Sequence, residues 1–346
     1  MRHPCPSTAE GIEELSLPGL YQTSRLAQAA ELDPAIGVGW GFDALANRGA
    51  VWKPAHLARE RQRRGSRLVA VRRVDRDRYP EDEVQALQKR WGLVAEDADA
   101  YLPMPPSAHR EIRPEIVLLH RVRGGPWSDL ASRVRFETAS VDSTIAATRG
   151  WFSERLVDQF RWLIGPSATP KGIAGLLLAS GARRDEHEPE LAAMVLDQEP
   201  PTVPGITVRR VASLPDFERM EAIRQEVFGS SDAEATDRPA DRRARWAEFQ
   251  ATAGTVAFLA ELEGAAVSYG LMSRTELGPM LLAGGVTLPQ ARGRGAYRAL
   301  VRARWEAARQ TGVPVLVTQA QAASRPILKR LGFRATATIK VLIDRP

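Results

Sequence analysis

An apolar run, a turn rich in glycine and arginine, and a helical pattern follow one another late in this 346-residue chain. The apolar run is MLLAGGVTL (280–288), the turn is PQARGRG (289–295), and residues 296–311 place alanine and leucine on one helical face. These periodicities predict a strand, a turn and a helix in direct succession. Such a succession is typical of mixed α/β proteins and limits the fold more than any other feature of the chain.

The turn has the composition of an anion-binding site. A turn between strand and helix places unpaired backbone N–H groups at the positive end of the helix dipole. Gly293 and Gly295 would let these groups approach a ligand without an intervening Cβ, and Arg292, Arg294 and Arg298 add positive charge. The alternative is a surface turn in an arginine-rich protein. The spacing matches neither the dinucleotide-binding fingerprint nor a P-loop.

A proline-rich segment, DQEPPTVPG (197–205), predicts a boundary between an N-terminal lobe, 1–200, and a C-terminal domain, 205–346. The C-terminal pattern predicts the order β-α-α-β-β-β, then the turn, then α-β-α-β, which is a mixed sheet with helices. In the N-terminal lobe, residues 160–181 repeat the strand–turn–helix order without a glycine–arginine turn. Two interpretations stay open for this lobe, a degenerate copy of the same fold or an unrelated one.

Two motifs carry a resemblance to the GNAT N-acyltransferases. LPQARGRGAY (288–297) and LKRLGF (328–333) stand in the order and at the separation of the pyrophosphate motif and the Leu-Gly-Phe motif of that family. The pyrophosphate motif, Gln/Arg-x-x-Gly-x-Gly/Ala, fits in two registers. The register that starts at Arg292 keeps the distance from the strand and is preferred, but it places Tyr297 near the phosphates, where a small residue is expected. The register that starts at Gln290 matches every position.

The resemblance covers 205–346 and, more weakly, parts of 116–200. It implies a GNAT-like catalytic domain, a second and degenerate GNAT-like lobe before it, and an acetyl or other acyl group carried by coenzyme A. It also implies a primary amine acceptor that attacks the thioester directly. Backbone groups of the strand end would pair with the pantetheine arm. The implied donor-binding residues are Val286, Thr287, Leu288, Arg292, Gly293, Arg294, Gly295, Ala296, Tyr297, Arg298 and Gln321.

The candidates for proton transfer are few. Many members of the family use a tyrosine as general acid at the position of Leu328, so Ser324 is the nearest hydroxyl candidate, with a helix N-cap as its alternative role. Glu276 is the candidate general base, and Glu263 and Tyr269 are alternatives. Positioning contributes a large part of such catalysis, so a missing acid does not exclude activity.

A basic segment raises a second hypothesis about the donor. The chain has a net charge of +6, and residues 51–80 contain ten Lys/Arg against three Asp/Glu, a local charge of 10 − 3 = +7. This segment could be a solvated surface, or it could bind the tRNA of an aminoacyl-tRNA donor on a tandem GNAT scaffold. A catalytically inactive binding module is a third hypothesis. The candidate tRNA contacts are Arg59, Arg61, Arg63, Arg64, Arg67, Arg72 and Arg73.

Composition excludes several other classes of protein. The single cysteine, Cys5, excludes an internal disulfide framework and favours a reducing compartment. The five histidines have no metal-ligand spacing, so no metal is expected. Neither a signal-peptide pattern nor an apolar run of membrane-spanning length is present. The sequence therefore predicts a cytoplasmic protein without a metal ion or membrane contact.

Overall fold

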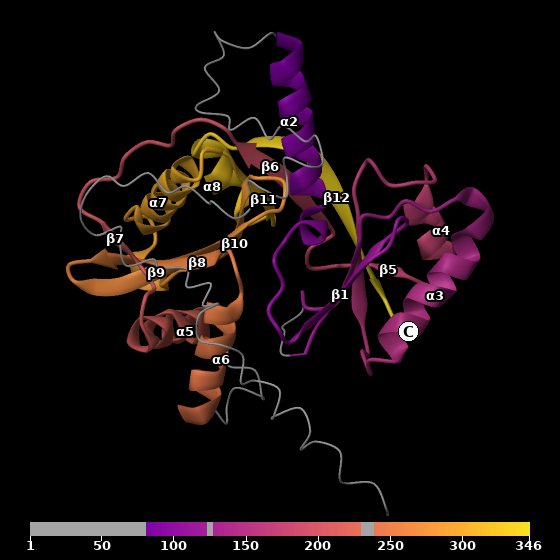
Figure 1. Cartoon of the computed structure of the whole chain (residues 1–346), viewed down its shortest axis with the longest axis horizontal. Coiled ribbons are helices and arrows are strands. Elements are labelled where there is room, and N and C mark those ends of the chain that lie inside the picture. Colours follow the sequence, from indigo (N-terminus) through magenta and orange to yellow (C-terminus); the bar gives the residue numbers. More distant parts are fainter. Residues whose placement is uncertain (1–80, 123–126, 230–238) are drawn as a thin grey trace, which may run out of the picture. The chain divides into compact units, whose positions relative to one another are not determined.

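The computed structural model describes residues 81–122, 127–229 and 239–346 (Figure 1). All described elements belong to one compact unit of the chain, 69–346. The arginine-rich segment near 53–78, with all seven candidate tRNA contacts, lies outside the described residues.

The C-terminal half has the predicted order of elements. Its first helix begins after Ser213, whose hydroxyl oxygen accepts a hydrogen bond from the Asp216 N–H over 3.3 Å, and it ends at Gly229 with φ +78°. The elements are β7 (Thr207–Arg210), α5 (Leu214–Phe228), α6 (Pro239–Ala251), β8 (Thr255–Leu262), β9 (Ala265–Arg274), β10 (Met280–Thr287), α7 (Ala296–Gln310), β11 (Leu316–Ala320), α8 (Arg325–Arg330) and β12 (Arg334–Asp344).

The N-terminal half repeats this core order. Its elements are α2 (Glu81–Glu96), β1 (Ala108–Ile112), β2 (Val117–Arg121), β3 (Leu130–Ser132), α3 (Val141–Ser153), β4 (Phe160–Ile164), α4 (Ile173–Ala179), β5 (Arg183–Arg184) and β6 (Glu190–Leu196), with short 3-10 helices at Ala98–Ala100 and Thr138–Ser140. β2 is antiparallel to both β1 and β3, and β3 is parallel to β4. The C-terminal half has the same pattern: β9 is antiparallel to both β8 and β10, and β10 is parallel to β11. Of the two interpretations, the degenerate copy is confirmed.

The two repeats exchange their last strands. β6, from the N-terminal half, lies between β11 and β12 and is antiparallel to both. β12, the last strand of the chain, then pairs with β4 of the N-terminal half. One sheet results, in the order β1-β2-β3-β4-β12-β6-β11-β10-β9-β8-β7, with β5 paired to β12 (Figure 1). The proline-rich segment therefore follows a strand that already belongs to the centre of this sheet.

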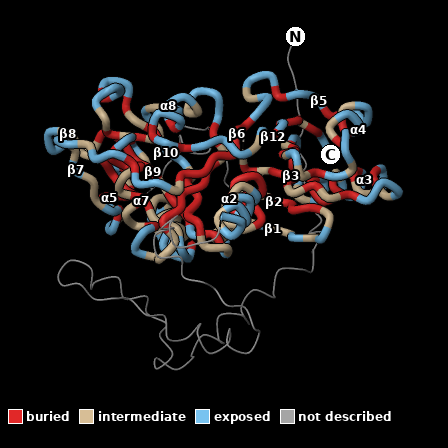
Figure 2. Tube along the Cα trace, turned by 90° about the horizontal axis from the view of Figure 1, so that it is seen from above, coloured by how far each residue is buried: buried red, intermediate tan, exposed pale blue. Residues whose placement is uncertain are grey.

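Helices cover both faces of the sheet, and the core lies between them and the strands (Figure 2). In β6, Leu191 and Val195 face a cluster that contains α2, whereas Met194 and Leu196 face a cluster that contains α7 and α8. α3 and α4 cover the same face as α7 through the cluster around Trp162, and α5 and α6 cover the α2 face. Alternation along the strands therefore supplies two cores, as expected for a central strand buried on both sides.

The strand exchange predicts that the C-terminal half does not fold alone. A fragment of residues 197–346 lacks β6, so β11 and β12 lose the partner between them and expose their backbone groups and apolar side chains. We expect this fragment to show no cooperative thermal transition by circular dichroism, whereas the full chain unfolds cooperatively. A cooperative transition in the isolated fragment would contradict the dependence on β6.

Candidate functional site

The two parallel strands at the centre of the C-terminal half separate soon after they meet. β10 and β11 pair at only two positions, Met280 with Leu316 and Leu281 with Val317. The hydroxyl of Thr318 then donates to a β10 carbonyl oxygen over 3.2 Å. No further ladder pair joins the described residues of these strands. This divergence leaves a gap in an otherwise continuous sheet.

β10, the strand beside the gap, contains a β-bulge in its ladder with β9. The register with β9 shifts between Ala283 and Gly285, and Gly284 has φ +57°. The left-handed φ favours glycine here, and a Cβ would also lie tightly against Leu271, 3.0 Å from its Cδ1. Gly284 and Gly285 are exposed although they belong to a central strand. Adjacent glycines in a strand pattern indicate such a bulge, a signal that the sequence prediction missed.

The glycine–arginine turn, residues 289–298, follows β10 directly. A short 3-10 helix leads from Leu288 into it, and Gly293 and Gly295 have φ of +78° and +96°. Gly295 is the N-cap of α7, so the N–H groups of Ala296 and its two successors have no carbonyl partner within the helix. Two left-handed glycines therefore stand directly before the N-terminus of a helix of 15 residues.

The three arginines of the turn differ in their contacts. Arg292 donates from Nε to a β10 carbonyl oxygen over 3.3 Å, and Arg294 pairs with Glu263 over 2.5 Å. The Arg298 guanidinium lies over the start of the helix, 3.4 Å from the position that a Cβ of Gly295 would occupy. Arg298 is exposed and has no hydrogen bond or ion pair within the described part of the chain. Positive charge therefore stands beside the free N–H groups.

Tyr297 turns its ring away from the turn. The ring packs beneath β10, where a Cβ at Gly285 would lie 2.9 Å from its Cε2 atom. Its centroid lies 5.7 Å from Cζ of the buried Arg304. The preferred register expected this residue near the phosphates; its backbone lies at the end of the turn, but its ring does not. The side chain points inward because the second position of α7 faces the sheet, and glycine at 285 makes room for it.

The strand-end residues that were expected to bind the donor border the gap. Val286 and Thr287 pair with Tyr269 and Ser268 of β9 through one backbone edge, and their other edge faces β11. Val286 is buried toward α5, so its side chain points away from the opening. Gln321 is exposed directly after β11, on the opposite side of the gap.

The two candidate catalytic residues lie at opposite ends of the strand pair. Glu276 precedes β10, is exposed, and stands 3.7 Å from Arg110. Ser324 follows β11, and its hydroxyl donates to the Gln321 carbonyl oxygen over 3.1 Å instead of capping the helix. Leu328, at the position of the family's tyrosine, is buried. Because β10 and β11 are parallel, the structure does not bring Ser324 and Glu276 together.

The structure also shows where the two alternative candidate bases, Glu263 and Tyr269, lie. Glu263 is in the β8–β9 turn and pairs with Arg294. Tyr269 is buried between β9 and α5, and burial, followed by the nearby Glu221 carboxylate, raises its pKa to about 12. Its phenol therefore stays protonated at neutral pH and can donate a proton but cannot accept one.

The N-terminal half has no comparable gap among its described residues. Arg135 forms a bridge with Thr169, the Phe136 N–H donates to the Thr169 carbonyl oxygen over 3.0 Å, and the Thr169 N–H donates to Val134 over 3.2 Å. The chain segments that follow β3 and β4 are thus joined where those that follow β10 and β11 separate.

In the N-terminal half, a buried polar network links the segments that follow β3 and β4 to the end of α2. Asp97 pairs with Arg135 over 2.5 Å, and Arg135 also donates to Ser167 Oγ over 2.6 Å. Glu96 accepts a hydrogen bond from the Ser167 N–H over 2.9 Å. Burial, opposed by Arg135, raises the pKa of Asp97 to about 6. No pattern in the sequence indicated this network, because its members come from three separate segments.

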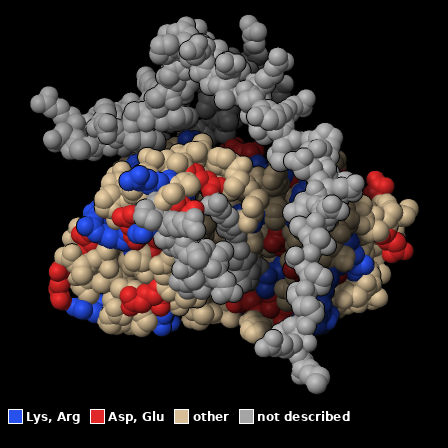
Figure 3. All heavy atoms as spheres, turned by 90° about the horizontal axis from the view of Figure 1, so that it is seen from below, with Lys and Arg blue, Asp and Glu red and all other residues tan. Residues whose placement is uncertain are grey.

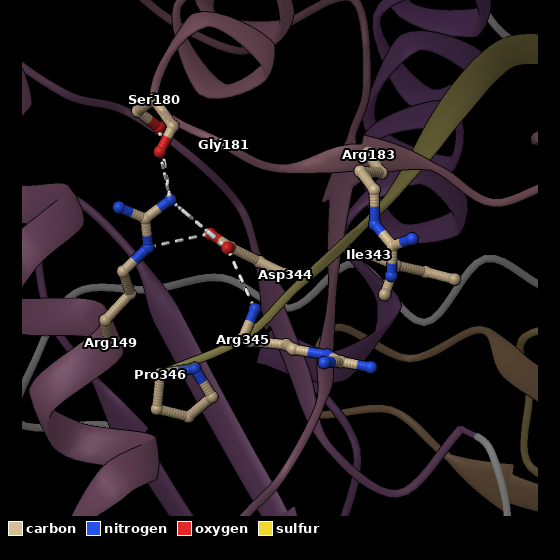
Figure 4. A pocket seen from close by; sticks show the side chains of 8 residues that line it. All are labelled: Arg149, Ser180, Gly181, Arg183, Ile343, Asp344, Arg345 and Pro346. Carbon is tan, nitrogen blue, oxygen red and sulfur yellow. Dashed lines mark hydrogen bonds and ion pairs between the residues drawn. The ribbon is translucent and has the colours of Figure 1, made fainter.

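Two cavities lie outside the gap. One, of about 430 Å³, lies between α5 and the β8–β9 turn and reaches Leu288 beside the glycine–arginine turn. The other, of about 320 Å³, lies at the end of β12 (Figure 4). In it Arg149 pairs with Asp344 over 3.0 Å, and Asp344 also accepts a hydrogen bond from Trp162, so these groups stabilise the N-terminal half.

Neither a metal centre nor a membrane span is found among the described residues. No group of three or more His, Cys, Asp or Glu side chains there is arranged to hold a metal ion. In the same part of the chain, every helix is too short or too polar to cross a bilayer.

Comparisons with known proteins identify the fold. No protein-family model and no curated protein matches the sequence. Among solved structures, a GCN5-related N-acetyltransferase from Kribbella flavida is similar, with 20% identity and a TM-score of 0.51, over 76% of this chain and 94% of that one. A tandem GNAT protein from the clavulanic acid biosynthesis pathway is similar with 16% identity and a TM-score of 0.50, over 77% and 95%. The described chain therefore has the tandem GNAT fold, and the predicted fold class is confirmed.

The contact between Tyr297 and Gly285 predicts a measurable coupling. Gly285→Ala places a methyl group against the ring, and we expect it to lower the free energy of unfolding by about 1–3 kcal/mol. In the background of Tyr297→Ala the same change should cost much less, so a double-mutant cycle in urea should show a coupling energy. As a control, Gly175→Ala meets no atom within 4 Å in α4 and should not destabilise the chain. Additive effects of Gly285→Ala and Tyr297→Ala would contradict the packing.

The pKa of Asp97 predicts a dependence of stability on pH. Its pKa is about 6 in the fold, against an ordinary value of 3.8, so the fold favours the protonated form. The carboxylate therefore lowers stability at neutral pH, and this loss disappears as the pH falls from about 6 toward 4. We expect Asp97→Asn to raise the free energy of unfolding by about 1–3 kcal/mol at pH 7 and to change it little near pH 4. Urea unfolding across this range measures the difference, and a destabilised variant at pH 7 would contradict it.

Proposed function

We propose that this chain is an acyl-CoA-dependent N-acyltransferase, in the simplest case an acetyltransferase, with its donor site in the C-terminal half. One observation carries the proposal: a gap between parallel strands leads, along a strand with an exposed bulge, to a glycine–arginine turn at a helix N-terminus. An extended, amide-containing ligand that ends in a pyrophosphate has the chemistry to fill both parts. Coenzyme A is such a ligand.

The proposed contacts follow from the order of these parts along the chain. The pyrophosphate would bind the N–H groups of residues 293–298, with Arg292, Arg294 and Arg298 providing charge. The pantetheine arm would lie along the open edge of residues 286–288, and Gln321 would contact it from the β11 side. The thioester would then lie beside the bulge.

The proposed reaction is direct attack of a primary amine on the thioester carbonyl carbon. Positioning in the gap supplies a large part of the rate enhancement. Ser324, at the end of β11, remains the candidate acid, and Glu276, at the start of β10, remains the candidate base. Because Glu276 precedes β10 and the bulge lies within that strand, this base could reach the amine only through a chain of several waters.

An aminoacyl-tRNA donor is the second candidate function. The charge of +7 on residues 51–80 favours it. The other argument for it was a bulky Tyr297 at the phosphates, and this argument is weakened because the ring packs beneath β10. On the visible part of the face drawn in Figure 3, basic and acidic side chains of the described residues are interspersed, without one large basic patch. The residues proposed to contact tRNA are those of the segment near 53–78.

The turn arginines provide the test of the donor. We expect coenzyme A to bind the wild-type chain in calorimetry, and Arg298→Gln to weaken this binding about 5- to 20-fold, because a charge-assisted hydrogen bond is lost. Binding of pantetheine, which has no pyrophosphate, should not change. Arg309→Gln is the matched control, since it removes an exposed arginine from the far end of α7.

The outcomes separate the candidate functions. Acetyl transfer from acetyl-CoA to members of a panel of primary amines would support the proposal. Retardation of tRNA at low salt, with an affinity that falls steeply as salt increases, and no coenzyme A binding would support the tRNA donor. Binding of neither donor would leave an inactive binding module and overturn both enzyme hypotheses.

A further inference from the structure

One arginine in the core of the C-terminal half has no acidic partner among the described residues. Arg304 lies in α7 with 0% of its surface exposed. Its Nε donates to the Leu300 carbonyl oxygen and its Nη1 to the Leu271 carbonyl oxygen, each over 3.1 Å. Its Nη2 has no hydrogen-bond partner in the same part of the chain. A cation in this position is costly, because burial removes its hydration and no anion replaces it.

The described surroundings of Arg304 contain no compensating charge. Burial lowers its pKa, and the Tyr297 side chain is the neighbouring group that opposes this shift. The arginine nearest to it in α7, Arg302, is instead paired with Glu199 and Glu306, each over 2.5 Å. On the strands beneath α7, Arg209 and Glu261 pair with one another. The charge of Arg304 is therefore not neutralised by the side chains that pack around it.

The guanidinium lies directly beneath the strand pair that borders the gap. A Cβ at Gly270 would lie 2.9 Å from both Cζ and Nη1 of Arg304. Gly270 of β9 pairs with Gly285 of β10, the exposed residue at the bulge. Adjacent strands are about 4.8 Å apart, so the charge lies roughly 8 Å from the open edge of β10.

The proposed donor places its sulfur near this point. Leu288 and the bulge at Gly284 are four positions apart, a distance of about 13 Å along the strand. The pantetheine arm contains two amide units and a thiol-bearing two-carbon end, which is comparable to about four extended residues. A donor anchored at the glycine–arginine turn would therefore present its sulfur beside the bulge.

We propose that Arg304 stabilises the coenzyme A thiolate that leaves during acyl transfer, acting through the β9–β10 strand pair without touching the sulfur. The inference rests on the proposed function. The amine nitrogen forms a bond to the thioester carbonyl carbon, the carbon–sulfur bond breaks, and its electron pair remains on the sulfur. The amine proton passes to water, and the thiolate later takes a proton from water, directly or by way of the Ser324 hydroxyl. In many GNAT enzymes a tyrosine at the position of Leu328 donates a proton to the leaving thiolate. Leu328 is buried and has no proton to donate, and the fixed charge of Arg304 would stabilise the thiolate in its place.

The size of the effect follows from Coulomb's law. At about 8 Å and an effective dielectric constant of about 20, one positive charge changes the ionisation constant of a thiol by about thirty-fold. This corresponds to about 1.5 pH units in the pKa of the bound thiol.

The test uses coenzyme A itself as the probe, so it needs no acceptor. The thiol pKa of bound coenzyme A is measured from thiolate absorbance against pH, with the signal of the unliganded protein, which contains Cys5, subtracted. We expect Arg304→Met to raise this pKa by about 1–1.5 units relative to the wild type. Arg304→Lys, which keeps the charge, should raise it less, and Arg302→Met, two residues away in the same helix, should leave it unchanged.

A stability measurement separates this role from a structural one. Replacing a buried, unpaired charge with an apolar side chain of similar length should keep or raise the unfolding temperature. A lower unfolding temperature of Arg304→Met with an unchanged thiol pKa would assign Arg304 a structural role and overturn the inference. An unchanged pKa in both Arg304 variants would also overturn it while coenzyme A binding, and so the proposed function, stands. Absence of coenzyme A binding to the wild type would overturn both.

Discussion

The exchange of β6 and β12 between the two repeats is the interaction on which the rest of the described structure depends. Along its whole length β11 is hydrogen-bonded to β6, from Leu316 with Leu196 to Ala320 with Ala192. Because this edge of β11 is satisfied, its other edge can leave β10 without the end of the sheet fraying. A gap can therefore open at the centre of a sheet, where a continuous ladder would otherwise be expected. The exchange makes the N-terminal half part of the scaffold of the candidate site.

The two repeats use the same strand order for different purposes. After β3 and β4 the chain closes through Arg135 and Thr169, and buried carboxylates of Glu96 and Asp97 fill the place. After β10 and β11 the chain stays open, and an aromatic ring and a guanidinium lie beneath the opening. The closed repeat joins its two segments by hydrogen bonds, and the open repeat leaves the proposed donor site between its strands. This division assigns the proposed chemistry to the C-terminal half.

Much of the fold could be predicted from the sequence, and the reasons are local. The boundaries of α5 follow from Ser213 and Gly229, and the start of α7 follows from Gly295, because caps and left-handed glycines act within a few residues. The resemblance at 288–297 and 328–333 predicted the GNAT fold because both motifs lie at turns. The place of β6 could not be predicted, since its partners β11 and β12 follow it by more than 100 residues.

The candidate site also has a part that could be predicted from the sequence and a part that could not. Residues 289–298 were predicted as a turn with free N–H groups and positive charge, because glycine conformation and a helix N-terminus are properties of a short segment. The direction of the Tyr297 ring, the burial of Arg304 and the raised pKa of Asp97 depend on strands that pack from elsewhere in the chain. The sequence by itself determined the order of the elements in the C-terminal half, the caps of α5 and the glycine–arginine turn. Tertiary structure alone decided which strands separate and which charges are buried, because pairing and desolvation act between segments that are distant in sequence.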